Sequence, residues 1–252
     1  MLAEIIENKR KEVEISKREF PLSGFKSRLK ISTRYFKRAI SKNKLSLIAE
    51  IKRASPSNKE FKNLDIRKII IIYNKYADAI SVLTDKQFFN GSLNDLKEVS
   101  KISKLPLLRK DFIVDEYQIY ESRLFNADAI LLIASVLTIE EINSFIEVAN
   151  KYKMDCLVEV NTEEELDKVL QTNAAIIGIN NRNLNTLEID LNATLQLADN
   201  IPDDKIIVSE SGIESTDYIN KIRGKVNAIL VGTFFMNSEK LEQDILSLTT
   251  SK

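Results

Sequence analysis

The chain alternates between short apolar runs and amphipathic stretches from residue 45 onward, and this alternation constrains the fold more than any other feature. Continuous apolar runs are typical of strands that are buried on both faces of a parallel sheet. Such runs occupy residues 45–52, 79–84, 106–110, 128–134, 155–160, 174–180, 205–210 and 227–232. Helices are predicted between them, at 64–76, 93–102, 115–125, from 138 onward, and at 162–170, 191–198, 216–222 and 238–248. The order predicts about eight βα units in succession.

The first 44 residues have a different pattern. Leu2, Ile5, Ile6, Lys9 and Val13 form a stripe at helical spacing, and residues 25–29 and 34–40 are expected to form two further short helical pieces. We therefore predict one (β/α)8 barrel domain over residues 1–252, of which 1–44 are an N-terminal helical extension. The length agrees, because such a barrel typically needs about 250 residues. A doubly wound sheet is the alternative, but no G-x-G-x-x-G motif follows the first predicted strand.

Composition narrows the chemistry. The chain has no histidine and one cysteine, which excludes catalysis by an imidazole, a histidine-ligated zinc site and an intrachain disulfide. Proton carriers must be Lys, Glu, Asp, Tyr or the single Cys156, and we expect Cys156 to be a small buried side chain. The balance of 37 basic and 37 acidic residues argues against general nucleic-acid binding. Without an apolar signal segment or a membrane span, we expect a soluble cytoplasmic protein.

Charged and amide side chains stand at the C-terminal ends of the predicted strands, where (β/α)8 barrels carry their active sites. Glu50 and Lys52 share one face of the first strand because strand side chains alternate. Other strand ends carry Lys110, Glu159, Asn180, Glu210, Ser211, Gly212, Gly232 and Thr233. Each alone has a plain explanation, as a solvated rim residue, a structural ion pair, a loop start or a turn glycine. Together they favour one polar cavity.

Two of the six glycines, Gly212 and Gly232, directly follow the last two predicted strands. Barrels often bind phosphate there, because backbone N–H groups approach an anion closely where no side chain intervenes. Left-handed turn geometry is the alternative explanation. A phosphate ester substrate fits better with Lys52 and Arg53 close to the end of the first strand.

Several strings at these strand ends resemble indole-3-glycerol-phosphate synthase of tryptophan biosynthesis. They run in order from residue 45 to 236 and include IAEIKRASPS (48–57), LTDKQFFNGSLNDL (83–96), PLLRKDFIVDEYQIYESR (106–123), ADAILLIAS (127–135), VEVNTEEEL (158–166), IGINNRNLNT (177–186), VSESGI (208–213) and VGTFFM (231–236). The combination of PLLRKDF with NNRNL and SESGI is specific. The resemblance implies a carboxy-lyase that closes the indole ring of 1-(2-carboxyphenylamino)-1-deoxyribulose 5-phosphate and releases carbon dioxide and water. It implies no metal or organic cofactor.

The resemblance also implies roles. Lys110 would protonate the substrate carbonyl, Glu159 would serve the dehydration, and Lys52 would pair with the substrate carboxylate. The implied catalytic set is Glu50, Lys52, Lys110, Glu159, Asn180 and Ser211. The implied substrate-binding set is Ser55, Phe89, Phe112, Arg182, Glu210, Gly212, Gly232 and Thr233, with the two phenylalanines on the anthranilate ring. A small phosphorylated substrate, no nucleic-acid or membrane partner, and a monomer are expected.

The chemistry of these residue types agrees with the reaction. Ring closure onto a ketone builds negative charge on oxygen, so a cation that can give a proton is needed beside it. An ordinary lysine, with a pKa of about 10.4, is charged at neutral pH and can donate. Loss of a hydroxyl as water needs an acid, and rearomatisation needs a base, so carboxylates and ammonium groups suffice.

The sequence departs from the family at three points: Asn58-Lys59 stand where Lys-Gly is common, Asn90 where Gly or Gln is usual, and Thr233 where a serine or an acid is frequent. The first departure bears on closure of the loop after the first strand.

Two other functions are possible for such a barrel. A phosphoribosylanthranilate isomerase would also bind phosphate, but the set Lys52, Lys110 and Glu159 belongs to the synthase. A barrel retired to a scaffold role would be expected to lose strand-end charges, and this chain keeps them.

Overall fold

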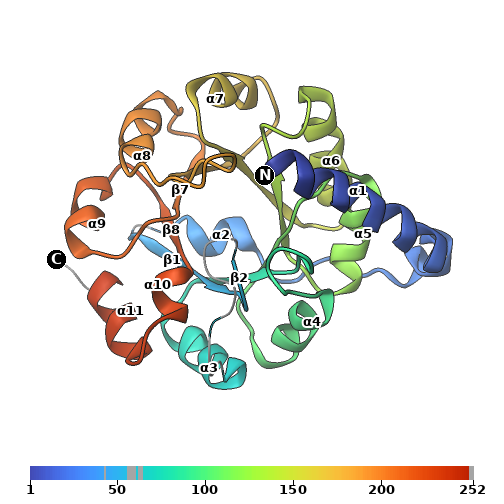
Figure 1. Ribbon diagram of the computed structural model, residues 1–252, viewed down its shortest axis with the longest axis horizontal. Helices are drawn as coiled ribbons and strands as arrows, with labels where there is room; N and C mark the ends of the chain where they lie inside the picture. The colour runs from blue at the N-terminus through green and yellow to red at the C-terminus, as the bar shows by residue number, and fades with distance from the viewer. Residues whose placement is uncertain (43, 56–60, 62–64, 250–252) are drawn as a thin grey trace.

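Eight parallel strands form a closed barrel in the order β1 to β8, with β8 pairing back to β1 (Figure 1). The computed structural model describes residues 1–42, 44–55, 61 and 65–249. The strands are β1 (Ser46–Ile51), β2 (Ala79–Leu83), β3 (Leu107–Lys110), β4 (Ala129–Ile133), β5 (Asp155–Val160), β6 (Ile176–Asn180), β7 (Ile206–Glu210) and β8 (Ala228–Val231). Each lies within its predicted apolar run, so the (β/α)8 prediction is confirmed and the doubly wound alternative is wrong.

The helices that follow the strands are α3 (Ile66–Tyr76), α4 (Leu93–Ile102), α5 (Glu116–Leu124), α6 (Ile139–Lys151), α7 (Glu163–Leu170), α8 (Asn192–Leu197), α9 (Thr216–Ile222) and α11 (Leu241–Thr249). They form the outer ring of the barrel (Figure 1). The sequence missed the four-residue helix α10 (Thr233–Met236) directly after β8, because so short a helix has no periodic pattern. The departure at Asn58-Lys59 lies outside the described residues.

Helix starts follow the capping chemistry of the sequence. Thr138 and Glu141 form a capping box at the start of α6. Ser92 caps α4 by accepting from the backbone N–H of Asp95, but the Asp95 carboxylate contacts Ser92 Oγ and Arg53 instead of closing a capping box. The nearby Asn90 has a left-handed φ of 51°, a conformation that Asn tolerates better than most residues, which explains why Asn can stand where Gly is usual.

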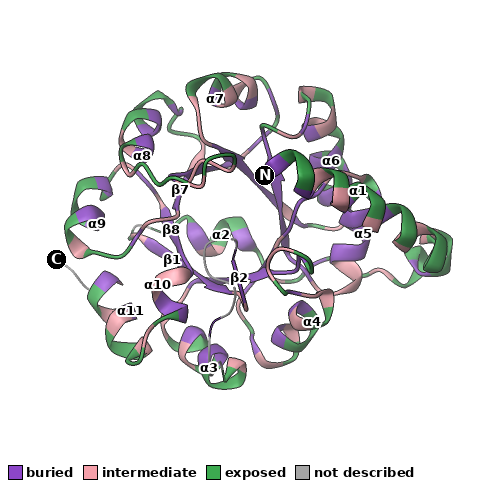
Figure 2. Cartoon of the chain, in the orientation of Figure 1, coloured by how far each residue is buried: buried purple, intermediate pink, exposed green. Residues whose placement is uncertain are grey.

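Apolar side chains fill both the inside of the barrel and the layer between the strands and helices. The inner cluster includes Ile48, Leu108, Leu131, Leu157 and Val208. The outer layer is larger, and the strands between the two layers are almost entirely buried (Figure 2). The barrel interior is therefore a packed core, as in other (β/α)8 barrels, whose sites lie at the carboxyl end of the strands.

The N-terminal extension covers both ends of the barrel. The long helix α1 (Leu2–Glu19) packs against α5, and its residues Leu2 and Ile5 belong to the inner apolar cluster. The 3₁₀ turns η1 (Leu22–Gly24) and η2 (Lys26–Arg28) lead to α2 (Phe36–Ile40), whose Phe36 also joins the inner cluster. The backbone N–H of Lys37 donates to Asp155 at the start of β5, so α2 closes the amino end. Elsewhere in the chain, the 3₁₀ turn η3 (Ala198–Asn200) directly follows α8.

No helix in the described part of the chain combines the length and apolar character needed to cross a membrane.

Candidate active site

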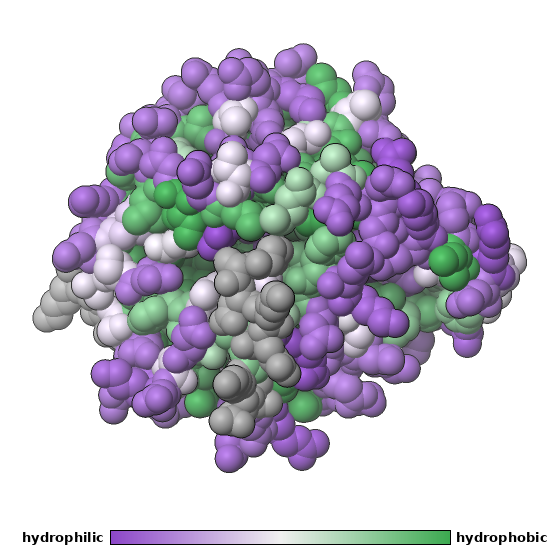
Figure 3. Space-filling model, viewed as in Figure 1, coloured by the Kyte–Doolittle hydropathy of each residue, from purple (hydrophilic) through white to green (hydrophobic). Residues whose placement is uncertain are grey.

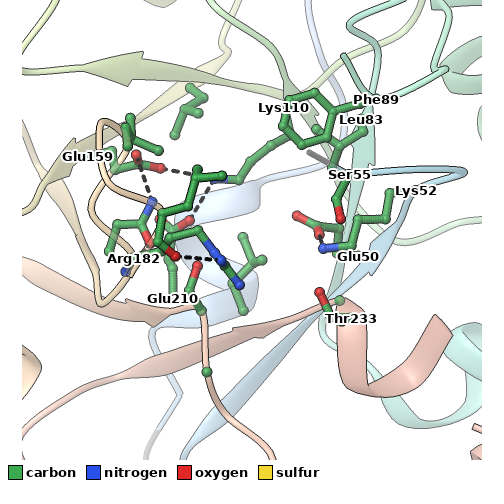
Figure 4. Close-up of a pocket in the computed structure, with 18 of the residues that line it drawn as sticks. Glu50, Lys52, Ser55, Leu83, Phe89, Lys110, Glu159, Arg182, Glu210 and Thr233 are labelled. Atoms are coloured by element: carbon green, nitrogen blue, oxygen red, sulfur yellow. Dashed lines mark hydrogen bonds and ion pairs between the residues drawn. The ribbon is translucent and has the colours of Figure 1, made fainter. Parts of the chain in front are cut away.

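One pocket at the carboxyl end of the barrel brings together every site residue predicted from the sequence. Its wall includes Glu50, Lys52, Ser55, Phe89, Lys110, Phe112, Glu159, Asn180, Arg182, Glu210, Ser211, Gly212, Gly232 and Thr233. Figure 4 shows the labelled members converging from different strands, and Figure 3 shows apolar residues gathered toward the middle of this otherwise hydrophilic face. The predicted gathering of strand-end polar residues around one cavity is thus present, whereas their individual roles stay predictions.

The Lys110 ammonium lies between two buried carboxylates. Its Nζ is 2.8 Å from Glu210 Oε2 and 3.0 Å from Glu159 Oε2 (Figure 4). Burial favours the neutral amine, but the negative charges of Glu159 and Glu210, with Glu50 close by, outweigh burial and raise the pKa of Lys110. Lys110 is therefore held as a charged donor with a side chain that is 13% exposed toward the pocket.

Glu210 has the opposite balance. Burial is the largest influence and, with repulsion from Glu159 and Glu50, it exceeds the attraction of Lys110 and raises the pKa of Glu210 to about 7. Its Oε1 has no hydrogen-bond partner among the described residues. Gly178 on β6 makes room for this carboxylate, because a Cβ there would collide with Glu210 Oε1. The site therefore holds a carboxyl group that changes protonation near neutral pH.

A second ion pair faces the first across the pocket. Lys52 Nζ is 3.0 Å from Glu50 Oε1, as the shared strand face predicted (Figure 4). The backbone carbonyl of Glu50 accepts from the buried Tyr73 hydroxyl. Gly232 follows β8 at the same level, and a Cβ at this position would collide with the Glu50 carboxylate. A closely packed carboxylate therefore explains Gly232 without a special backbone angle.

Amide groups fix the third side of the pocket. Asn180 Nδ2 donates to Glu159 Oε1 at 3.0 Å, and Asn180 Oδ1 accepts from the backbone N–H of Arg182. The Arg182 guanidinium donates to the carbonyl of Leu187 in the same loop. Asn180 thus orients the Glu159 carboxylate toward Lys110, and Arg182 holds the loop that passes over the pocket.

The turn after β7 has an unusual backbone. Ser211 and Gly212 both adopt left-handed φ values, 68° and 72°. Asn181 supports this turn by donating from Nδ2 to the Ser211 carbonyl at 3.0 Å, and it also contacts Tyr218 and Thr194 in a buried polar network. The sequence reasoning missed Asn181. Its position next to Asn180 at the end of a buried strand was the available signal.

Aromatic and aliphatic side chains make the remaining wall. Phe89 and Phe112 lie with ring centroids 6.2 Å apart. Several apolar residues that were not predicted from the sequence reach the pocket from the start of the chain and from the loop after β6: Met1, Leu2, Ile5, Leu184, Leu187 and Ile189. Their contribution depends on how distant segments pack, which no local pattern reveals. The pocket therefore offers one apolar end and one charged interior.

Among the residues that the structure describes, no group of three or more His, Cys, Asp or Glu side chains could hold a metal ion. Cys156 is buried, as expected, and burial raises the pKa of its thiol.

Comparison with known proteins assigns the family. A family model described as indole-3-glycerol phosphate synthase matches residues 2–248. Enzymes of that name from Endomicrobium trichonymphae and Thermoanaerobacter pseudethanolicus are each 45% identical to the chain; the first alignment covers 84% of both proteins, and the second covers 94% of this chain and 92% of its relative. The tryptophan biosynthesis protein TrpCF of Buchnera aphidicola from Acyrthosiphon pisum is 42% identical, and the match covers 98% of this chain but 55% of that protein.

Solved structures agree on the fold alone. The tryptophan synthase alpha-subunit of Pyrococcus furiosus superposes with a TM-score of 0.60 at 16% identity, covering 82% of this chain and 98% of the other. The N-(5'-phosphoribosyl)anthranilate isomerase of the same organism superposes with a TM-score of 0.60 at 14% identity, covering 82% and 100%. At such low sequence identity, these structures do not assign a family. The family model and the relatives at 45% identity do: the chain belongs to the indole-3-glycerol phosphate synthase family, carboxy-lyases of tryptophan biosynthesis.

Proposed function

We propose that this protein converts 1-(2-carboxyphenylamino)-1-deoxyribulose 5-phosphate into indole-3-glycerol phosphate, with loss of carbon dioxide and water, by acid–base catalysis with Lys110 and Glu159. The observation that carries this proposal is the Lys110 ammonium, which lies between the buried carboxylates of Glu159 and Glu210 at the pocket wall opposite Lys52. A charged proton donor, a carboxylate and a second cation are the groups that the reaction needs.

The substrate has three parts that match three parts of the pocket. Its aromatic ring would lie against Phe89 and Phe112, and its carboxylate would pair with Lys52. Its phosphate would lie near Gly212, Gly232 and Thr233, with Ser55 and Arg182 close to the charged end. This orientation directs the ribulose carbonyl toward Lys110.

In the first step, the ring carbon that bears the carboxylate attacks the carbonyl carbon, and Lys110 gives its proton to the carbonyl oxygen. The neighbouring carboxylates raise the pKa of Lys110 and so keep it protonated before the reaction. Loss of carbon dioxide then returns the electron pair of the carbon–carboxylate bond to the ring. The product of this step is a cyclic alcohol.

In the second step, the new hydroxyl leaves as water and a ring proton is lost, which completes the indole. Glu159 would serve as the acid–base group here, oriented by Asn180. Glu210 shares the Lys110 ammonium with Glu159 and changes protonation near neutral pH, so it adds a proton-holding group beside both. Glu50 would keep Lys52 in place. Since every step requires only proton transfer and charge stabilisation, the proposal includes no metal or organic cofactor.

The test is to mix the purified protein with the carboxyphenylamino-deoxyribulose phosphate and follow indole fluorescence. We expect formation of product at neutral pH at a rate unaffected by EDTA. Lys110→Met serves as the matched control, since it keeps the side-chain length without the charge. Absence of product across a broad pH range would contradict the function, and full activity in the Lys110→Met variant would contradict the mechanism.

We also propose that the protein acts in the cytoplasm as a single-domain monomer, because one chain supplies every predicted site residue to the pocket. Light scattering on the purified protein tests this, with a mass of 28.8 kDa expected. A mass near twice that value would contradict it.

A further inference from the structure

Lys9 is a buried lysine on α1 that the reaction does not use. It belongs to the stripe of α1 that faces the barrel, between Ile5 and Val13, and only 3% of its surface is exposed. A buried ammonium is strongly unfavourable unless it is paired. Lys11 and Lys17 on the same helix are far more exposed. The barrel must therefore supply partners that make this one position suitable for a cation.

Those partners come from two different strand ends. Lys9 Nζ lies 2.8 Å from Asp85 Oδ2 and 3.0 Å from Asp111 Oδ1, and it also reaches Glu12 on its own helix at 2.8 Å. Asp85 follows β2, and Asp111 directly follows Lys110 on β3. One ammonium group thus joins α1, the loop after β2 and the loop after β3.

The same two carboxylates shape the aromatic wall of the pocket. Asp85 Oδ1 accepts from the backbone N–H of Phe88, which precedes Phe89, and Asp111 Oδ1 accepts from the backbone N–H of Phe112. At the other end of the contact, α1 places Leu2 and Ile5 on the pocket wall. Lys9 therefore lies where the three segments of the apolar end meet.

Electrostatics agrees with this arrangement. Burial acts to lower the pKa of Lys9, but attraction to Asp111 and Asp85 outweighs burial and raises it. Asp111 has a second cation, because Arg109 lies 3.0 Å from its Oδ2, whereas burial raises the pKa of Asp85 despite Lys9. Loss of Lys9 would leave Asp85 as the uncompensated partner.

We propose that Lys9 is a positioning residue for the synthase reaction: it seats α1 on Asp85 and Asp111 so that Leu2 and Ile5 complete the apolar wall that receives the aromatic ring of the substrate. It acts through α1 and the two loops and does not touch the reacting atoms. This inference rests on the proposed function, since it assigns the aromatic ring to this end of the pocket.

The test uses a variant that loses the contact between α1 and the barrel without leaving an unpaired buried charge that could unfold the protein. Lys9→Met alone leaves a buried carboxylate unpaired, so the main variant is Lys9→Met with Asp85→Asn, in which the amide oxygen can still accept from Phe88. The matched control is Lys17→Met, which removes an ion pair between α1 and Asp115 on the barrel at the far end of the helix. Steady-state kinetics and hydrogen exchange of the amides in residues 2–19 are measured for all three proteins.

For the double variant we expect KM to rise about tenfold with kcat within about threefold, because the lost contacts act on binding in ground and transition state alike. Amides in the first half of α1 should exchange faster than in the wild type. Lys17→Met should keep KM within about twofold. A wild-type KM in the double variant, unchanged exchange in α1, or an equal rise of KM in Lys17→Met would overturn the inference. If the wild type forms no product, the proposed function fails, and the exchange measurement alone decides whether Lys9 seats α1.

Discussion

Two lysines near the carboxyl end of the barrel, the buried Lys9 and the largely buried Lys110, have similar immediate surroundings. Lys9 lies 2.8 and 3.0 Å from Asp85 and Asp111, and Lys110 lies 2.8 and 3.0 Å from Glu210 and Glu159. In both clusters the carboxylate side chains are at most 4% exposed. Lys9 has one further partner, Glu12 on its own helix, but the two ion pairs that each lysine makes with strand-end carboxylates do not distinguish the clusters.

The difference lies in what else contacts the carboxylates. Asp111 also accepts from Thr84 and Phe112 and pairs with Arg109, so its pKa falls to about 2 although burial alone would raise it. Glu210 has Lys110 as its cation and one oxygen without a hydrogen bond among the described residues, and its pKa rises to about 7. The Lys9 cluster therefore contains one carboxylate, Asp111, that stays charged at neutral pH, although burial raises the pKa of Asp85. The Lys110 cluster contains a carboxyl group, Glu210, that can gain or lose a proton there. A carboxyl group with a pKa near neutral at the pocket wall marks the Lys110 cluster as the reactive one.

The largest expected effect comes from removing the lysine of the reactive cluster. Lys110→Met should lower kcat/KM by about 10³-fold or more, because the general acid of ring closure is lost. Lys110→Met should also lower the free energy of unfolding less than Lys9→Met does, since Glu210 already accepts a proton near neutral pH. Indole fluorescence and urea unfolding measure the two quantities. If the Lys110 and Lys9 variants lost activity and stability to the same extent, the two clusters would not differ in function.

Replacing Asp111 in the Lys9 cluster should act mainly on stability. Asp111→Asn leaves Lys9 and Arg109 near a neutral amide, and it should reduce the free energy of unfolding by about 3–5 kcal/mol at pH 7. Because the folded pKa of Asp111 is lowered to about 2, its contribution is present above the ordinary value of 3.8 and disappears as the pH falls through 2. Urea unfolding at neutral pH checks this, and a loss below about 1 kcal/mol would show that Asp111 is not an essential partner.

Glu210→Gln tests the reactive cluster from the other direction. The folded pKa of Glu210 is raised from 4.5 to about 7, so the charged group destabilises the protein increasingly as the pH rises between these values. A neutral amide removes this penalty, and we expect a gain of about 1–3 kcal/mol at pH 8 and almost none at pH 5, together with reduced activity. Urea unfolding of the wild type and of Glu210→Gln at pH 5 and pH 8 measures this gain. A gain of equal size at both would show that protonation of Glu210 is not the cause.

The smallest effect is expected for an exposed pair on the same helix as Lys9. Lys11 pairs with Glu7 on the surface of α1, where solvent screens both charges. Lys11→Met should change the free energy of unfolding by no more than about 0.5 kcal/mol. A thermal or urea unfolding curve that shifts as much as that of a Lys9 variant would mean that helix α1 responds to any loss of charge, and burial would no longer explain the contrast.

Much of the fold followed from local pattern because a parallel barrel repeats one simple rule. Strands buried on both faces must be continuously apolar, and the polar residue that ends such a run lies at the open end of the barrel. For this reason Lys110, Glu159 and Asn180 could be placed in one cavity before the structure was known. The short helix α10 was not predicted, because four residues carry too little periodic signal.

Other features depend on contacts between segments that are far apart in sequence, so local pattern could not predict them. Lys9 fitted its apolar stripe by spacing, yet only the meeting of α1 with two strand ends explains why a cation can be buried there. The pocket residues Leu2 and Ile5 reach the site from a helix that precedes the barrel. Asn181 supports the left-handed Ser211 from the neighbouring strand.

By itself the sequence determined the barrel, its strand ends and the residue types that line the site, because these depend on spacing along the chain. The tertiary structure decided which lysine contacts a carboxylate with a lowered pKa, Asp111, and which contacts a carboxyl group with a raised pKa, Glu210. That choice depends on the number of donors each buried carboxylate meets from segments far apart in sequence, and burial makes each missing or added donor a large shift in pKa.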